Sequence, residues 1–179
     1  MGRDTLANAS ARLQSNVVKA LTGYYRLKDF IYTIRACKTL AEERTLVVRE
    51  SAAIRTSFKE DISVDQQYHA VAKLLFIYMM GYPAHFGQVE SLKMVASPRI
   101  KEKRLGYLGS TLLLDENQPT LTLITNSLKH DLNDSTQSIV ALALSNLAIT
   151  ASSDISRDLA PEIERLLQSS SPYIKKKVL

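Results

Sequence analysis

Hydrophobic residues along much of the chain recur at intervals of three and four, which is the spacing of one face of an α-helix. The clearest example is residues 27–38, where the apolar stripe consists of Leu27, Phe30, Ile31 and Ile34. Basic residues occupy the opposite side of the same segment. No stretch combines strict alternation, β-branched residues and hairpin turns, so no sheet is expected. The pattern predicts an all-α protein.

Capping residues, glycines and prolines mark the predicted helix ends. Thr39 with Glu42, and Ser63 with Gln66, have the spacing of a capping box. Gly81 predicts the end of a helix that is strongly apolar from residue 71 to 80, because glycine suits the residue after a helix. Further helices are predicted over residues 39–59, 86–96, 99–114, 121–129 and 138–149. Three more are predicted towards the end of the sequence: a short helix after Ser153–Asp154, one from Pro161 to Leu167, and one after Ser171–Pro172.

An internal repeat suggests how these helices are organised. The segment SPRIKEK at 97–103 resembles SPYIKKK at 171–177, which lies 74 residues further on. Midway between them, Asp134–Ser135 opens another helix, which gives a period of about 37 residues with two helices per unit. Such hairpins bury their apolar faces by stacking, so we expect a right-handed α-solenoid of the HEAT or armadillo kind. The last hairpin has no polar cap, and we therefore expect a fragment of a longer solenoid.

The first 25 residues are set apart as an N-terminal extension from a solenoid that covers residues 26–179. Their apolar positions fall roughly on one helical face and comprise Leu6, Leu13, Val17 and Leu21. This segment fits a helix that caps the fold, a mobile tail or an amphipathic membrane contact, and the sequence leaves these three open.

The composition of the chain limits which classes of function it can have. The chain has 179 residues, 45% of them hydrophobic, which is enough for one domain with a core. Its 23 Lys and Arg against 18 Asp and Glu give a net charge of +5. No stripe of basic and aromatic residues and no zinc-ligand spacing accompanies this charge, so we expect no nucleic-acid binding. A weak attraction to acidic membrane surfaces fits the charge equally well.

The sequence offers little that could carry catalysis. Cys37 is the only cysteine, which excludes an internal disulfide and suits a reducing cytosol. The three histidines, His69, His85 and His130, stand in separate segments without metal-ligand spacing. Neither a Gly-x-Ser-x-Gly motif nor a glycine-rich phosphate loop is present. We therefore expect a protein without catalytic residues, cofactor or metal, and not an enzyme.

The helix predicted over residues 86–96 is the best candidate for a binding surface. Val89, Leu92 and Ala96 share one face, yet Met94 and Val95 point elsewhere. Either this helix is buried on most sides, or one face meets another protein.

Several ordered segments resemble the gamma-adaptin family, the large subunits of clathrin adaptor complexes at the trans-Golgi network and endosomes. The segments are GYPAHFGQ at 81–88, KRLGYLG at 103–109, LLLDE at 112–116, DLN at 131–133, STQ at 135–137 and RDLA at 157–160. The resemblance covers residues 26–179. Alpha-type and epsilon-type adaptor subunits are the nearest alternatives, and YPAH with LLLDE favours gamma.

The resemblance implies an adaptin trunk that acts as a scaffold in vesicle transport and lies peripherally on trans-Golgi and endosomal membranes. Its implied partners are a sigma small subunit, the beta large and mu medium subunits, and an Arf-family GTPase in its GTP form. Clathrin would bind only through a hinge outside this sequence. The alternative is an unrelated HEAT or armadillo module, such as a transport receptor or regulatory scaffold.

The resemblance also assigns residues to three sites. Val89, Leu92 and Leu123 correspond to the GTPase contact. Arg35 corresponds to an arginine that receives the acidic residue of dileucine cargo signals, a role suited to a guanidinium that forks onto a carboxylate. For phosphoinositides the implied residues are Lys28, Lys38 and Lys73. That lipid site is expected to be weak, because QQYH at 66–69 replaces residues that are more basic in relatives.

Overall fold

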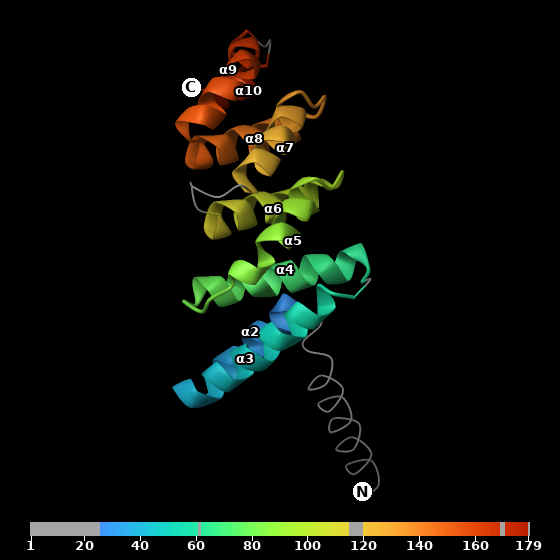
Figure 1. The fold of residues 1–179 in the computed structure, drawn as a ribbon, viewed down its shortest axis with the longest axis vertical. Coiled ribbons are helices and arrows are strands. Elements are labelled where there is room, and N and C mark those ends of the chain that lie inside the picture. The colour runs from blue at the N-terminus through green and yellow to red at the C-terminus, as the bar shows by residue number, and fades with distance from the viewer. Residues whose placement is uncertain (1–25, 61, 115–119, 169–170, 179) are drawn as a thin grey trace, which may run out of the picture. The chain divides into compact units, whose positions relative to one another are not determined.

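The computed structural model describes residues 26–60, 62–114, 120–168 and 171–178, with the backbone alone at 120–122 (Figure 1). These ranges contain α-helices, one 3-10 turn and no strand, which confirms the predicted all-α fold. The chain divides into two compact units, Met1–Ala84 and His85–Leu179. The predictions for residues 1–25 lie outside the described residues, and a single solenoid over residues 26–179 stays a prediction.

The described part of the first unit consists of α2 (Leu27–Ala36), α3 (Leu40–Ser57) and α4 (Val64–Met79). Helix α4 packs against both α2 and α3. Its core contains Phe30 from α2, Ile54 from α3, and Leu74, Leu75 and Ile77 from α4, all nearly or fully inaccessible to solvent. Phe30 meets Phe76 edge to face with ring centroids 6.0 Å apart, so aromatic packing joins α2 to α4.

Both predicted N-cap side chains are confirmed, and the capping box is complete only at Ser63. The Thr39 side chain accepts a hydrogen bond from the backbone N–H of Glu42, and Glu42 in turn accepts from the N–H of Lys38 at 2.8 Å. At the start of α4, Ser63 and Gln66 form a complete capping box. These side chains satisfy N–H groups that have no partner within the helix, which is why α3 and α4 begin where the sequence places them.

Helix α4 ends at the predicted glycine. Gly81 has φ +90°, a conformation that strains other residues. Its N–H donates to the carbonyl of Tyr78, and the N–H of Tyr82 donates to that of Ile77, which is the pattern of a Schellman motif. The Tyr82 hydroxyl then donates to Glu43 of α3 at 2.8 Å. The stop at Gly81 is therefore confirmed within the first unit.

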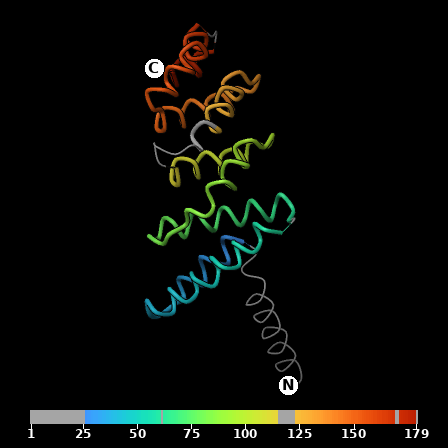
Figure 2. The backbone as a smooth tube through the Cα atoms, viewed as in Figure 1, coloured from blue at the N-terminus to red at the C-terminus, as the bar shows by residue number. Residues whose placement is uncertain are grey.

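The second unit begins with a 3-10 turn, η1, and continues as consecutive helical pairs (Figure 2). Its elements are η1 (His85–Gly87), α5 (Gln88–Val95), α6 (Ile100–Leu113), α7 (Thr120–Leu132), α8 (Gln137–Thr150), α9 (Ser153–Leu167) and α10 (Pro172–Val178). Helix α5 pairs with α6, α7 with α8, and α9 with α10. Contacts of α5 with α7, α6 with α8, α7 with α9 and α8 with α10 stack these pairs, as predicted for hairpin repeats.

The helix predicted over residues 99–114 is α6, which begins at Ile100 with Arg99 as its N-cap, so its start agrees to within one residue. The proline-based prediction for α9 differs from the structure. Helix α9 runs unbroken through Pro161, although separate helices were predicted on either side of it. The apolar stripe of α9 continues across the proline, with Ile155, Leu159 and Leu166 all buried, and this burial outweighs the one helical hydrogen bond that proline cannot donate.

Helix α6 approaches α5 so closely that only glycine fits at the contact. A Cβ added to Gly106 would lie 2.4 Å from the backbone nitrogen of Val95 and 2.7 Å from the carbonyl carbon of Met94. Both atoms belong to the backbone of α5 and cannot rotate away. Gly106 therefore sets the separation of the first hairpin of this unit.

Replacing Gly106 with alanine is expected to lower the free energy of unfolding by about 1–3 kcal/mol through overpacking. The sign of this change is informative, because replacing glycine with alanine at an accessible position inside a helix stabilises the protein by about 1 kcal/mol. Urea unfolding followed by circular dichroism measures the change, with Arg104→Ala on the exposed side of α6 as control. A Gly106→Ala variant as stable as the parent chain would show that the helices do not meet at this point.

Candidate docking face and polar pocket

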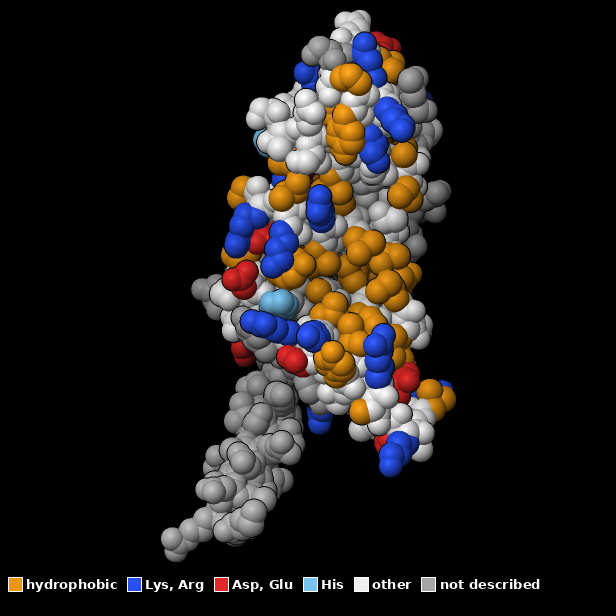
Figure 3. Space-filling model, turned by 180° about the vertical axis from the view of Figure 1, so that it is seen from behind, with side chains coloured by type: hydrophobic (Ala, Val, Ile, Leu, Met, Phe, Trp, Pro, Cys, Tyr) orange, Lys and Arg blue, Asp and Glu red, His pale blue; other side chains and the backbone are white. Residues whose placement is uncertain are grey.

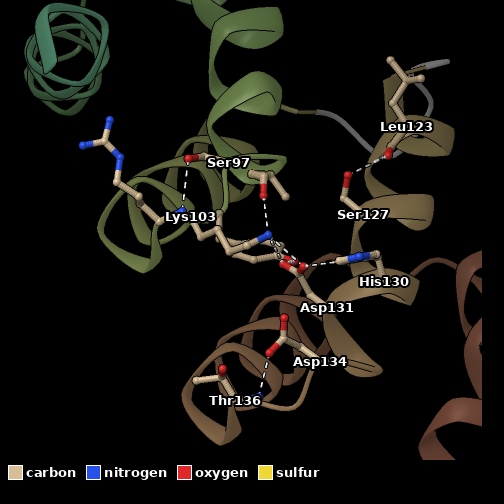
Figure 4. A network of polar contacts seen from close by, with 11 residues as sticks. Ser97, Lys103, Leu123, Ser127, His130, Asp131, Asp134 and Thr136 are labelled. Atoms are coloured by element: carbon tan, nitrogen blue, oxygen red, sulfur yellow. Dashed lines mark hydrogen bonds and ion pairs between the residues drawn. The ribbon is translucent and has the colours of Figure 1, made fainter. Parts of the chain in front are cut away.

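A buried ion pair lies at the centre of the second unit (Figure 4). The ammonium of Lys103 on α6 donates to both carboxylate oxygens of Asp131 on α7, each at 2.8 Å. Its third hydrogen bond goes to the carbonyl of Val95 at the end of α5, also at 2.8 Å. The side chains of Lys103 and Asp131 are 6% and 1% exposed. One lysine therefore connects three helices.

Tyr107 completes this polar centre. Its hydroxyl donates to Asp131 at 2.8 Å from one helical turn beyond Lys103. Burial, and then the bond to the Asp131 carboxylate, raise the pKa of Tyr107 far above its ordinary value of 10.0, so the phenol remains a donor. Behind it, the amide of Asn146 on α8 donates to the Tyr107 carbonyl at 3.1 Å and to Thr111 at 2.9 Å. The network thus extends from α5 to α8.

A pocket of about 440 Å³ opens beside the ion pair. Its lining residues are Ala96, Ser97, Pro98, Lys103, Asn126, Ser127, His130, Asp131, Asp134 and Ile139. The His130 ring nitrogen Nδ1 lies 3.4 Å from Asp131. Asp134 accepts the backbone N–H of Thr136 at 2.7 Å, and this bond lowers the pKa of its carboxyl group. The pocket is therefore lined by one buried ion pair and one accessible carboxylate.

The three residues assigned to a GTPase contact all lie in this unit, on two helices that touch. Val89 on α5 and Leu123 on α7 are 56% and 60% exposed. Leu92, one turn after Val89, is only partly accessible and packs on the hydrophobic core. We call the exposed surface formed by Val89 and Leu123 the α5–α7 face, and it is the candidate docking face. Leu92 lies beneath it, partly exposed and partly packed on the core.

Basic and hydrophobic side chains intermingle on the face of the molecule shown in Figure 3, where acidic side chains are fewer. In the first unit, Lys28, Tyr32 and Arg35 are exposed and spaced along one side of α2. The Lys28 ammonium lies 5.7 Å from the centre of the Tyr32 ring, a cation–π arrangement. Lys38, just beyond this helix, is also exposed.

Lys73 is placed differently from its predicted role. It is 7% exposed and forms a buried ion pair with Glu50 of α3, which is fully buried. A lysine held in this way is not accessible to a lipid headgroup, and we remove Lys73 from the proposed lipid contact. The partners in these buried pairs, Glu50 with Lys73 and Asp131 with Lys103, are 23 and 28 residues apart in the sequence, so local patterns did not predict either pair.

Within the described ranges, no three His, Cys, Asp or Glu residues are grouped so that they could hold a metal ion. Over the same residues, none of the helices has both the length and the apolar character that crossing a bilayer requires.

Stacked helical hairpins define a fold of the α-solenoid class. Residues 43–179 match the family model described as the adaptin N terminal region, and the chain belongs to this family. The predicted resemblance to gamma-adaptin is confirmed by the relatives that the chain matches.

Three relatives illustrate the match. The chain is 54% identical over 158 residues to AP-1 complex subunit gamma-1 of Mycosarcoma maydis, which covers 88% of this chain and 18% of the relative. It is 57% identical over 152 residues to AP-1 complex subunit gamma-1 of Arabidopsis thaliana, a match that covers 85% of this chain and 17% of the relative. It is 50% identical over 154 residues to AP-1 complex subunit gamma-like 2 of Mus musculus, a match that covers 86% of this chain and 19% of the relative. The chain thus spans less than one fifth of the length of these relatives.

Breaking the ion pair from either side is expected to lower the free energy of unfolding by about 3–5 kcal/mol, because the remaining charge stays buried without a partner. Lys103→Met and Asp131→Leu should each have this effect. The double variant should lose much less than the sum of the two, since it leaves neither charge uncompensated.

Urea unfolding of the parent chain, the two single variants and the double variant measures this coupling. The exposed pair Arg157–Asp154 on α9, 3.5 Å apart with side chains 78% and 84% exposed, is the matched control. Its single variants, Arg157→Met and Asp154→Leu, should change stability by less than about 1 kcal/mol. Additive losses in the Lys103 and Asp131 cycle would contradict a coupled buried pair.

Proposed function

We propose that this chain is the N-terminal part of the trunk of a large subunit in a clathrin adaptor complex. It would act as a helical, non-enzymatic scaffold for cargo sorting and membrane recruitment. The observation that carries the proposal is the accessible apolar face of α5 and α7 in a chain whose relatives are named as AP-1 gamma subunits. An unrelated HEAT or armadillo module has no comparable support.

The proposed partners follow from membership of such a complex. A sigma small subunit, a beta large subunit and a mu medium subunit would assemble with the complete protein. The complex would lie peripherally on trans-Golgi and endosomal membranes, and clathrin would be recruited by parts beyond this sequence.

The proposed ligand of the α5–α7 face is an Arf-family GTPase in its GTP form. Val89 and Leu123 expose apolar surface on neighbouring helices, and covering it with an apolar patch of a partner is favourable at about 25 cal/mol per Å². Leu92 supports this face from the core side.

Val89→Asp and Leu123→Asp are each expected to weaken binding of the GTP-loaded GTPase by about tenfold or more, because each places a charge in an apolar contact. Both residues are exposed, so the helical circular dichroism spectrum should be unchanged. Leu92→Asp is less suitable, since Leu92 packs on the core and its replacement would also destabilise the fold.

Pull-down or calorimetry with GTP-loaded and GDP-loaded GTPase tests this, using the chain alone and co-expressed with a sigma subunit. Ile149→Asp on α8 is the matched control, because Ile149 is an equally exposed apolar residue at 69%. Equal binding by Val89→Asp, Leu123→Asp and Ile149→Asp would overturn the assignment of this face.

The exposed side of α2 is the proposed contact for cargo and lipid. Arg35 would pair with the acidic residue of a dileucine signal, since its guanidinium stays charged and presents paired donors. Lys28 and Lys38 would face phosphoinositide headgroups, each basic residue contributing about 1 kcal/mol near an anionic surface. All three are exposed.

One vesicle experiment separates the two roles. The chain with a sigma subunit is sedimented with phosphoinositide vesicles that do or do not display an acidic dileucine peptide. Arg35→Gln should remove only the peptide-dependent binding, and the Lys28→Gln, Lys38→Gln double variant only the lipid-dependent part. Arg104→Gln, another exposed basic residue, is the control. Peptide binding retained by Arg35→Gln would refute the cargo role.

A further inference from the structure

The pocket beside Lys103 and the docking face share two helices. Along α7, Leu123, Asn126 and His130 follow one another on the exposed side, at intervals of three and four residues. Figure 4 shows Leu123, Ser127 and His130 in line along this helix, with Asp131 turned toward Lys103. Ala96 and Ser97, which follow α5, contribute another wall. A partner on the docking face would therefore border the pocket.

The charge of the pocket favours a cation. Lys103 is fully engaged by Asp131 and by the Val95 carbonyl, so it offers no donor to an anion. Asp134 is different: its carboxylate accepts hydrogen bonds from the backbone N–H of Thr136 at 2.7 Å and from the Thr136 side chain. An ionised carboxylate has about four acceptor sites, so Asp134 can still accept from a ligand.

The residues that line the pocket indicate what kind of cation would fit it. Ala96, Pro98 and Ile139 provide apolar surface, while Asp134, Asn126 and Ser127 provide polar groups. A side chain with an aliphatic stem and a charged end matches this combination, because the stem contacts apolar surface and the end reaches a carboxylate. A metal ion would use none of the apolar wall.

We propose that this pocket binds a lysine or arginine side chain of the protein that docks on the α5–α7 face, with Asp134 as the pairing carboxylate. The identity of that protein rests on the proposed function, whereas the preference of the pocket for a cation does not. The pocket would then add charge selectivity to a face whose remaining contacts are apolar.

Amide chemical shifts of the isotope-labelled chain test the pocket directly, with N-acetyl-arginine amide and N-acetyl-lysine amide as probes. N-acetyl-norleucine amide has a similar stem without the charge and is the negative control. The cationic probes should shift the amides of Ala96, Ser127 and Asp134, and Asp134→Asn should weaken their binding by about tenfold. Asparagine retains the oxygen that accepts from Thr136, so the start of α8 is preserved.

Asp158→Asn is the matched control, because it removes the same charge from an exposed position on α9. It should bind the cationic probes as the parent chain does. Equal probe binding by Asp134→Asn and the parent chain, equal binding of norleucine amide, or no shift at the pocket would each overturn the proposal.

The partner is tested separately, by binding of the GTP-loaded GTPase to Asp134→Asn. Weaker binding with a reduced dependence on salt supports insertion of a basic side chain. Unchanged GTPase affinity in a variant that has lost the arginine probe overturns the assignment to this partner. Probe binding without any GTPase binding by the parent chain would instead refute the docking function and leave the cation site intact.

Discussion

The second unit depends on the burial of Lys103 and Asp131. Moving two charges out of water costs several kcal/mol for each ion, and this cost is offset only when every donor and acceptor finds a partner. Here the lysine needs the last carbonyl of α5 and a carboxylate from α7, and that carboxylate also needs Tyr107. A shift of one helix by one residue would leave a charge unpaired. The pair therefore fixes the relative register of three helices, while apolar packing supplies the net stability.

The same arrangement explains why the outer sides of α5 and α7 are not needed to hold the second unit together. The internal contacts of these helices include Val95, Ile124 and Leu128, which are fully buried. Lys103 of α6 adds hydrogen bonds to the Val95 carbonyl of α5 and to Asp131 of α7. Val89 and Leu123 are not needed for that packing and expose more than half of their surface. Because the supporting helices are held rigidly, an apolar partner would lose little free energy in ordering this face.

Local signals in the sequence predicted local structure well. The side-chain cap at Thr39, the capping box at Ser63 and the glycine stop at Gly81 each depend on residues within five positions of each other. Pro161 was misread because its effect depends on the burial of residues on both sides of it, which the local rule ignores. Lys73 was misread for a similar reason: its partner Glu50 lies 23 residues away, and nothing near Lys73 distinguishes a buried ion pair from a solvent-exposed charge.

The repeated heptapeptides show how far a motif alone can determine the environment of a lysine. Lys103 and Lys177 occupy equivalent positions in the two copies. Lys103 is buried against Asp131, which follows it by 28 residues, whereas Lys177 is exposed and donates to Ser145 at 3.2 Å. The motif thus places a lysine on the second helix of a hairpin, and the role of Lys103 depends on Asp131 of the hairpin that follows it. Where that neighbour supplies a carboxylate, as α7 does, the lysine joins the core and fixes the register.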